Sequence, residues 1–242
     1  MCCIGIEMHN NSDLTLHQIE IGGKLILFED GRYDTKIVTS MRQGGYEATE
    51  RSIVPKLFRT GDRVLEIGTA VGLVTMVLAD VVGNENVIGF EANPSLVEDA
   101  RRNFVANNHA ITVKNQVLEN QLCWAGEGST SDFFIQREYW ASSLTNKPGT
   151  ISTVSVPNAC FEHEIRAFHA NCLVCDIEGG EIDLLTSANL VGIDKIMIEI
   201  HYWAGRSLIN RLIRKLIFDG FSIDFDLSLR SVLALHRGLE PK

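Results

Sequence analysis

The stretch 63–78, Arg-Val-Leu-Glu-Ile-Gly-Thr-Ala-Val-Gly-Leu-Val-Thr-Met-Val-Leu, predicts a strand, a glycine turn and a helix in succession. Its first part is an apolar run without alternation, which is typical of a strand buried on both faces of a parallel sheet. Gly68 and Gly72 bracket the turn, where side chains would keep a ligand away from the backbone. The spacing G-x-x-x-G lacks the glycine that lets a diphosphate sit on the helix N-terminus in dinucleotide folds. The stretch therefore predicts a cofactor loop without a phosphate site.

A second apolar strand, Val87–Glu91, ends in a carboxylate about 20 residues beyond the glycine loop, where nucleotide folds hold ribose hydroxyls. Glu66, directly before the loop, supplies a carboxylate that could bind the amino-acid end of a cofactor. Residues 115–118 follow the third strand, where they could flank an adenine. An amino-acid end, a ribose and an adenine without phosphate describe S-adenosylmethionine, which is the predicted cofactor. The candidate cofactor residues are Glu66, Gly68, Ala70, Gly72, Glu91, Ala92, Asn115 and Val117.

Length, charge and the N-terminal sequence limit the class of protein. The 242 residues, 45% of them hydrophobic, are enough for one α/β domain, with or without a small appendage. A net charge of −9 without a dense run of Lys or Arg predicts no nucleic-acid partner and a small or neutral substrate. Because we find neither a signal-peptide pattern nor an apolar run of membrane-spanning length, we expect a cytoplasmic protein without a membrane partner; a homo-oligomer is left open.

The six cysteines are predicted to be free thiols, since the chain shows no secretion signal. Cys172-x-x-Cys175 invites a redox or zinc interpretation, but it lies in a predicted buried strand and has no second pair at zinc spacing. Strand alternation sends the two side chains to opposite faces, so we interpret them as buried thiols.

The chain divides into a predicted N-terminal β-rich cap, residues 1–45, and a cofactor domain, residues 46–242. In the cap we expect a strand at 25–28, a hairpin turn at 29–31 and a return strand at 33–38. The pattern loosens at about 121–157, which predicts an insertion with extra strands that lines a substrate pocket.

A second chemical centre follows the later strands. A buried strand ends in Asp176, with Glu178 and Glu181 just beyond it, and the next strand ends in Glu199 and His201. The last two strands, 221–225 and 231–235, suit an antiparallel hairpin. The pattern predicts an α/β fold with a Rossmann-like seven-stranded sheet, mostly parallel with a C-terminal antiparallel strand, helices on both faces and the small cap. Ligands of such sheets bind beyond the carboxyl strand ends, so Glu66, Glu91, Asp176 and His201 should converge on one crevice.

At this point the sequence resembles the class I S-adenosylmethionine-dependent methyltransferases, and within them the FkbM type, from about residue 46 to residue 235. The resemblance is carried by Val-Leu-Glu-Ile-Gly-Thr-Ala-Val-Gly at 64–72, Phe-Glu-Ala-Asn-Pro at 90–94, Ser-Ser-Leu at 142–144, Asp-Ile-Glu-Gly-Gly-Glu at 176–181 and Ile-Glu-Ile-His at 198–201. It implies O-methylation of a hydroxyl on a sugar or another small molecule, and it implies that Glu47 and Ser143 contact the cofactor. The chain departs from the family pattern at Val174, where Lys is common, and at 157–158, where Leu-Asp is common. The family's substrate contacts are therefore not carried over to these positions.

Transfer of a methyl group to an alcohol needs a base for the hydroxyl proton, and we assign His201 as that base because histidine titrates near neutrality. Asp176 is expected to orient the acceptor hydroxyl. Glu178, Glu181 and Glu199 are candidates for substrate or metal contact, although acids at a helix start are also favoured by the helix dipole alone. No metal is assigned. Two other functions stay open: a nicotinamide-dependent oxidoreductase, disfavoured by the missing third glycine, and a non-catalytic methyltransferase-like interaction module.

Overall fold

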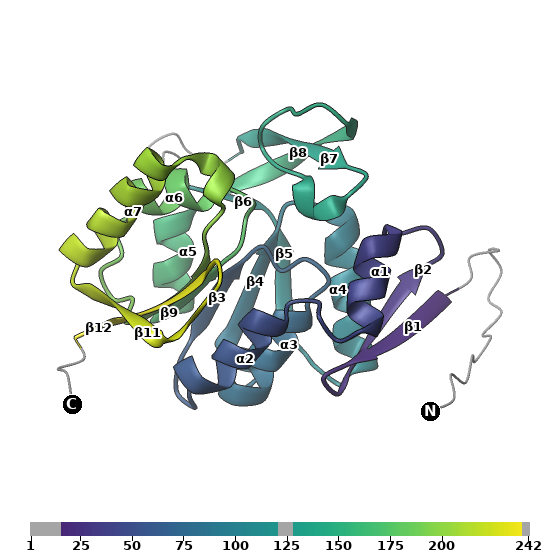
Figure 1. The fold of residues 1–242 in the computed structure, drawn as a ribbon, viewed down its shortest axis with the longest axis horizontal. Helices are drawn as coiled ribbons and strands as arrows, with labels where there is room; N and C mark the ends of the chain where they lie inside the picture. The colour runs from purple at the N-terminus through teal and green to yellow at the C-terminus, as the bar shows by residue number, and fades with distance from the viewer. Residues whose placement is uncertain (1–15, 121–127, 239–242) are drawn as a thin grey trace.

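A computed structural model describes residues 16–120 and 128–238. A seven-stranded sheet lies at its centre, in the order β11-β12-β10-β9-β3-β4-β5 (Figure 1). β12 runs antiparallel to both neighbours, and the pairs from β10 to β5 are parallel. This confirms the predicted fold class. The strands of this sheet are β3 (Val64–Ile67), β4 (Val87–Glu91), β5 (Thr112–Asn115), β9 (Cys172–Cys175), β10 (Lys195–Glu199), β11 (Phe221–Leu229) and β12 (Val232–Arg237).

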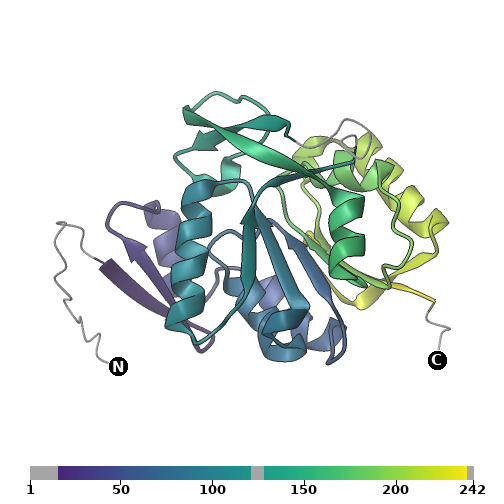
Figure 2. The same ribbon diagram turned by 180° about the vertical axis from the view of Figure 1, so that it is seen from behind.

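Helices cover both faces of the sheet, as Figure 2 shows from behind. α2 (Ala48–Leu57) and α3 (Leu73–Val82) share one apolar cluster with side chains of β3, β9 and β12. α5 (Phe161–Phe168), α6 (Glu181–Ser187) and α7 (Arg206–Phe218) share another with the opposite side chains of the same sheet. β3 and β9 are buried at every position, which explains their unbroken apolar sequences. Because β3 and β9 run parallel, their carboxyl ends lie at the same edge of the sheet.

The N-terminal part differs from the predicted cap. Its strands are β1 (Leu16–Ile21) and β2 (Lys24–Glu29), and the turn between them is Gly22-Gly23, where both residues have positive φ, 57° and 80°. Such a two-residue turn suits glycine and matches strand twist. The predicted return strand at 33–38 is wrong, because Asp34 caps a helix there, α1 (Thr35–Arg42), by accepting from the amides of Lys36 and Ile37.

The hairpin is fastened to α4 (Pro94–Ala106) rather than to the central sheet. Asn103 and Asn107 each accept a backbone N–H of β2, at 2.8 Å, and Asn107 also donates to the Leu25 carbonyl at 2.7 Å. The two side-chain amides thus replace a neighbouring strand along the free edge of β2. The apolar side chains of the hairpin share one cluster with α3 and α4, so the described part of the cap has no separate core.

Two strands of the predicted insertion form, with a third strand that precedes it, a second sheet over the carboxyl ends of the first (Figure 1). Its strands are β6 (Val117–Glu119), β7 (Thr130–Gln136) and β8 (Thr150–Cys160), in the order β6-β8-β7. Extra strands in this region were predicted. β8 leads directly into α5, a helix that the sequence pattern did not predict.

Cys172 and Cys175 are buried free thiols that belong to clusters on opposite faces of the sheet, as predicted. Cys160, in contrast, takes part in a disulfide bond, so the prediction of free thiols throughout was wrong. Sequence spacing alone does not reveal which cysteines a fold brings together. Among the helices of the described residues, none has the length and apolar character needed to cross a membrane.

Candidate active site

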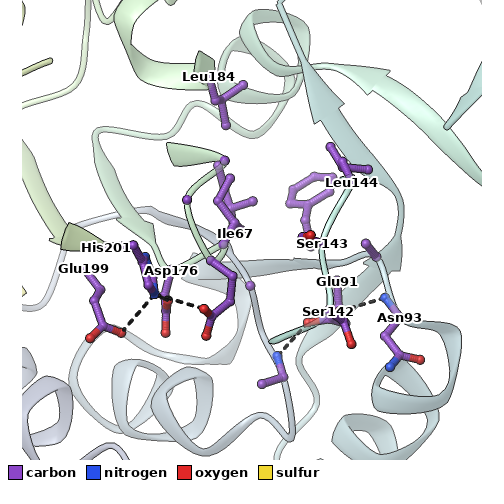
Figure 3. A pocket seen from close by; sticks show the side chains of 18 of the residues that line it. Ile67, Glu91, Asn93, Ser142, Ser143, Leu144, Asp176, Leu184, Glu199 and His201 are labelled. Carbon is purple, nitrogen blue, oxygen red and sulfur yellow. Dashed lines mark hydrogen bonds and ion pairs between the residues drawn. The ribbon is translucent and has the colours of Figure 1, made fainter. Parts of the chain in front are cut away.

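A cavity of about 900 Å³ lies at the carboxyl ends of β3, β4, β9 and β10, beneath the second sheet (Figure 3). The segment before α2 and the β7–β8 connection complete its walls. The predicted site residues that line it are Glu47, Gly68, Ala70, Glu91, Ala92, Val117, Ser143, Asp176, Glu178, Glu199 and His201. Four others, Glu66, Gly72, Asn115 and Glu181, are not part of its lining. Convergence at the strand ends therefore brings most of the predicted residues together.

The glycines of the cofactor loop are required by the protein's own packing. A Cβ on Gly68, which has a φ of 90°, would lie 1.8 Å from the carbonyl oxygen of Asp176, and one on Gly72 would lie 2.5 Å from the Phe104 ring. The loop between them adopts positive φ at Ala70 as well, at 47°. Because residue 68 is glycine, the end of β3 can lie against the backbone that follows β9, which brings the cofactor loop next to Asp176.

Glu66 supports the loop from below instead of lining the cavity. Its side chain is 2% exposed, and its Oε2 accepts hydrogen bonds from the hydroxyls of Thr69, at 3.1 Å, and Thr75. Burial raises the pKa of Glu66 to about 7, although the two hydroxyls lower it. A Cβ on Gly89 would lie 2.3 Å from the Thr69 hydroxyl oxygen, so glycine there makes room for this network. Glu66 therefore shapes the loop that the cofactor would contact.

Glu91 lines the cavity at the end of β4. One carboxylate oxygen accepts the Ala70 backbone N–H at 2.9 Å, and the other accepts that of Asn93 at 2.7 Å. Burial raises the pKa of Glu91, while these backbone donors lower it. Each carboxylate oxygen keeps a second lone pair, so the acid can also accept hydroxyl groups of a ligand.

The residues assigned to the adenine region divide into wall and support. Ala92 and Val117 lie in the cavity lining. Asn115 lies behind it and donates to the carbonyls of Glu91 and Ala92, both at 2.9 Å, which joins the ends of β4 and β5. Ser143 lines the wall from the β7–β8 connection, and its hydroxyl bonds to the Thr145 carbonyl at 3.0 Å.

Glu47 lies at the start of α2 with a φ of 48°, a left-handed conformation that is uncommon for a residue other than glycine. Its Oε2 is buried in the cavity wall and has no hydrogen-bond partner. Burial raises the pKa of Glu47 to about 8. Strained backbone of this kind persists where the surroundings enforce it, and the same cavity holds two further examples, Ala70 and Glu178.

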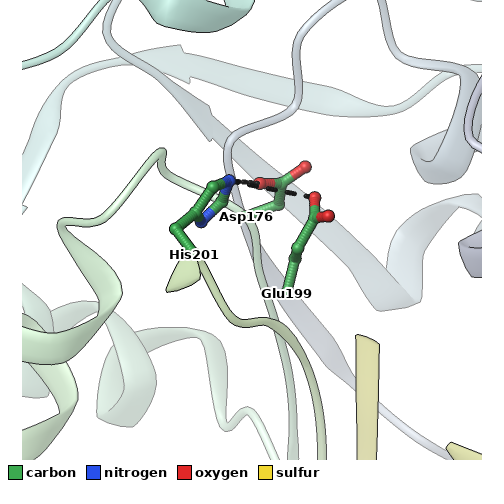
Figure 4. Close-up of side chains that lie close together, drawn as sticks. All are labelled: Asp176, Glu199 and His201. Carbon is green, nitrogen blue, oxygen red and sulfur yellow. Dashed lines mark ion pairs between the residues drawn. The ribbon is translucent and has the colours of Figure 1, made fainter. Parts of the chain in front are cut away.

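At the opposite end of the cavity, carboxylates surround a single imidazole (Figure 4). His201 Nε2 lies 3.3 Å from Glu178 Oε2, 3.7 Å from Asp176 Oδ1 and 4.0 Å from Glu199 Oε2. Its Nδ1 lies 3.1 Å from Oε1 of Glu181, which is fully buried. Glu181 also accepts the backbone N–H groups of Gly179, at 2.7 Å, and His201, at 3.2 Å. It therefore fastens the loops after β9 and β10 to each other.

These carboxylates shift the pKa of His201. Burial lowers its pKa, but hydrogen bonds to Glu178 and Glu181 and the neighbouring charges outweigh this and raise the pKa to about 10. The assignment of His201 as general base stays a prediction from the sequence, and Glu178, 3.3 Å from Nε2, is a second group that can hold the proton. Burial and the charges of Glu199 and Glu178 raise the pKa of Asp176 well above its ordinary value.

Aromatic residues that the sequence did not single out close the cavity on two sides. The Tyr139 hydroxyl, from the β7–β8 connection, donates to the Tyr46 hydroxyl at 2.7 Å. Across the opening, the Lys147 ammonium lies 4.4 Å from the centre of the Trp203 ring, which packs over Gly179. All four side chains belong to the lining. The motif around Ser143 pointed to this connection, but no local spacing showed that Tyr139 meets Tyr46.

The strand order and the glycine loop are those of the fold of class I S-adenosylmethionine-dependent methyltransferases. The family model that matches is protein-L-isoaspartate(D-aspartate) O-methyltransferase, over residues 52–128. This part includes the cofactor loop and Glu91, and it supports S-adenosylmethionine as the cofactor. No curated protein matches the chain.

Solved structures of methyltransferases show similar folds. Ribosomal protein L11 methylase from Lactobacillus delbrueckii subsp. bulgaricus aligns with a TM-score of 0.48 and 12% identity over 80% of this chain and 79% of its own. TYW2 from M. jannaschii, in complex with AdoMet, aligns with a TM-score of 0.42 and 12% identity over 94% and 85%. The 23S rRNA methyltransferase ErmE aligns with a TM-score of 0.40 and 16% identity over 80% and 69%.

These neighbours correct one prediction from composition. We excluded a nucleic-acid partner because the chain has a net charge of −9, yet an rRNA methyltransferase and a ribosomal protein methylase are among the chains of similar fold. Net charge describes the whole surface, whereas binding depends on the local potential at the contact. The exclusion was therefore wrong.

Proposed function

We propose that this chain transfers the methyl group of S-adenosylmethionine to a hydroxyl of a small molecule or sugar, in the manner of the FkbM type that its motifs resemble. The observation that carries the proposal is that one cavity joins a cofactor end, at Gly68, Ala70 and Glu91, to an acidic end, at Asp176 and Glu178. Its volume of about 900 Å³ lies at the upper end of ligand sites and leaves room for an acceptor beside the cofactor.

In this proposal Glu91 accepts the ribose hydroxyls, and Ala92 and Val117 flank the adenine. Glu47, before α2, and Ser143, in the β7–β8 connection, contact the cofactor. The buried, unpartnered Oε2 of Glu47 supports its assignment, because a cationic ammonium would satisfy it. Glu66, Gly72 and Asn115, which lie outside the lining, act by holding the loop and strand ends in place.

The acceptor hydroxyl lies at the acidic end. Asp176 Oδ1 is buried without a hydrogen-bond partner, so it is available to a hydroxyl donor and can orient it. The acceptor oxygen forms a bond to the methyl carbon as the methyl–sulfur bond breaks, and neutral S-adenosylhomocysteine leaves. The hydroxyl proton passes to Glu178, whose Oε2 lies 3.3 Å from His201 Nε2. The protein's main contribution is alignment and exclusion of water. A cytoplasmic location and the division into a cap, 1–45, and a methyltransferase domain, 46–242, stay predictions from the sequence.

The test uses radiolabelled S-adenosylmethionine with a panel of hydroxyl acceptors, together with rRNA and protein acceptors, and compares the native chain with Asp176→Asn. We expect label in a hydroxyl-bearing small molecule, and a rate at least about a hundredfold lower in the variant with cofactor affinity retained. Label in RNA or protein alone would refute the acceptor class. Binding of NADH but not of S-adenosylmethionine in a fluorescence titration would refute the reaction class.

A further inference from the structure

The acidic end of the cavity holds more negative charge than His201 alone can balance. Four carboxylates lie within 4.0 Å of the His201 ring nitrogens. The pairs with Glu178 and Glu199 involve side chains that are 24% and 27% exposed, and His201 is 11% exposed. In such partly shielded surroundings like charges repel more strongly than in water, so the group is arranged for a further cation.

A second observation points to a ligand at this place. Oδ1 of Asp176 is an oxygen atom without solvent contact, and it accepts no hydrogen bond. The nearest histidine nitrogen, His201 Nε2, lies 3.7 Å away, beyond hydrogen-bonding distance. Buried acceptors without a partner are uncommon in folded proteins and call for a bound ion or water. Figure 4 shows this side chain turned toward His201 and Glu199.

The separations of two donor atoms from His201 Nε2 are those of ligands on one metal ion. Asp176, Glu199 and His201 each offer one atom, and these atoms all lie within 4.8 Å of one another. Ligands at about 2.1 Å from an ion are separated by about 3.0 Å at right angles and about 4.2 Å when opposite. The distances from Nε2, 3.7 Å to Asp176 Oδ1 and 4.0 Å to Glu199 Oε2, fall between these limits.

The residue behind the imidazole completes the arrangement. Metal-binding histidines usually donate the ring N–H that faces away from the metal to a carboxylate, which fixes the orientation of the ring. Glu181 occupies that position with no exposed surface, 3.1 Å from Nδ1, and is itself held by the Gly179 amide. Nε2 is thereby turned toward Asp176 and Glu199.

We propose that Asp176, Glu199 and His201 bind one divalent metal ion of the Mn²⁺ type at the acceptor end of the cavity, with Glu181 as the positioning residue behind His201. Two carboxylates and one imidazole suit such a borderline-hard cation. Binding of the ion needs only the described side chains. Its use in catalysis rests on the proposed function: with Asp176 Oδ1 on the ion, the ion would replace this oxygen as the contact of the acceptor hydroxyl and make the hydroxyl more acidic, and Glu178, which is outside the ligand set, would receive the proton.

The experiment measures Mn²⁺ binding to the full-length, metal-stripped chain without cofactor, by calorimetry and by the loss of the free-Mn²⁺ electron spin resonance signal. We expect one ion per chain. Glu199→Gln and His201→Ala should each weaken binding at least tenfold, and Glu181→Gln should weaken it about tenfold through the histidine. Asp183→Asn is the matched control, since Asp183 lines the same cavity outside the cluster and should leave the affinity unchanged.

Circular dichroism and S-adenosylmethionine affinity show that each variant is folded. Absence of Mn²⁺ binding at millimolar concentration would overturn the proposal, as would unchanged affinity in folded Glu199→Gln and His201→Ala. An equal loss in Asp183→Asn would also overturn it, because binding would then follow net charge alone. These readouts need no methyl acceptor, so they stand whether or not the O-methyl transfer is found.

Discussion

Replacement of Glu66 by Gln should remove a specific part of the pH dependence of stability. The folded chain keeps this carboxyl buried with a pKa of about 7, whereas the ordinary value of a glutamate is 4.5. Between these values the unfolded chain ionises Glu66 and the folded chain does not. Because the pKa is raised in the folded state, the stabilisation is complete below pH 4.5 and is lost as the pH rises through 7.

The size of this effect follows from the two pKa values. A difference between 4.5 and 7, at about 1.4 kcal/mol per pH unit, corresponds to about 3 kcal/mol lost between acidic and mildly alkaline conditions. The amide side chain of the Glu66→Gln variant cannot ionise, but its oxygen can still accept from Thr69 and Thr75. Part of this loss already occurs below pH 5, so between pH 5 and pH 8 the stability of the variant should fall by about 2.5 kcal/mol less than that of the native chain.

Urea unfolding of both proteins at pH 5 and pH 8 measures this difference, with Glu98→Gln as the control for the same change at an exposed position. Other groups also titrate over this range, but their contributions to the unfolding free energy are the same in both proteins and cancel in the difference. If Glu66→Gln and the native chain lost the same stability between the two pH values, the buried, proton-holding role of Glu66 would be refuted. A pH dependence altered equally in Glu98→Gln would point to net charge instead.

Two further variants test the cofactor end of the cavity. Glu91→Ala should weaken S-adenosylmethionine binding at least about tenfold in calorimetry, because two charge-assisted hydrogen bonds to the ribose are lost, and unchanged affinity in a folded variant would remove Glu91 from the site. Gly68→Ala should lower the midpoint of thermal unfolding strongly, since its Cβ would lie 1.8 Å from the Asp176 carbonyl oxygen and positive φ disfavours alanine. Gly192→Ala, also at positive φ but with nothing within 4 Å, is its control, and an equal loss in both would show that backbone strain alone is responsible.

Local sequence patterns were sufficient where the structure depends on near neighbours. The apolar run before Gly68, the helix after Gly72 and the acid at the end of β4 identified the cofactor half, because buried parallel strands and glycine turns leave strong local signals. The prediction of the N-terminal hairpin was wrong because it relied on the weaker of two local signals. An apolar stretch and a nearby Asp-Gly resembled a hairpin turn, while the Gly22-Gly23 turn and the Asp34 helix cap carried the actual signal.

The sequence by itself determined the strand-and-helix order, the cofactor loop and the set of acids at the strand ends, since each of these is written in contiguous residues. Only the tertiary structure decided what those acids do. It buried Glu66 beneath the loop, and it placed Glu181 behind His201 from another strand end. It also brought Tyr139 to Tyr46 across 93 positions of chain. Burial and the distance between charges set the pKa of a group and the partners it can hold, and both arise only when distant segments pack together.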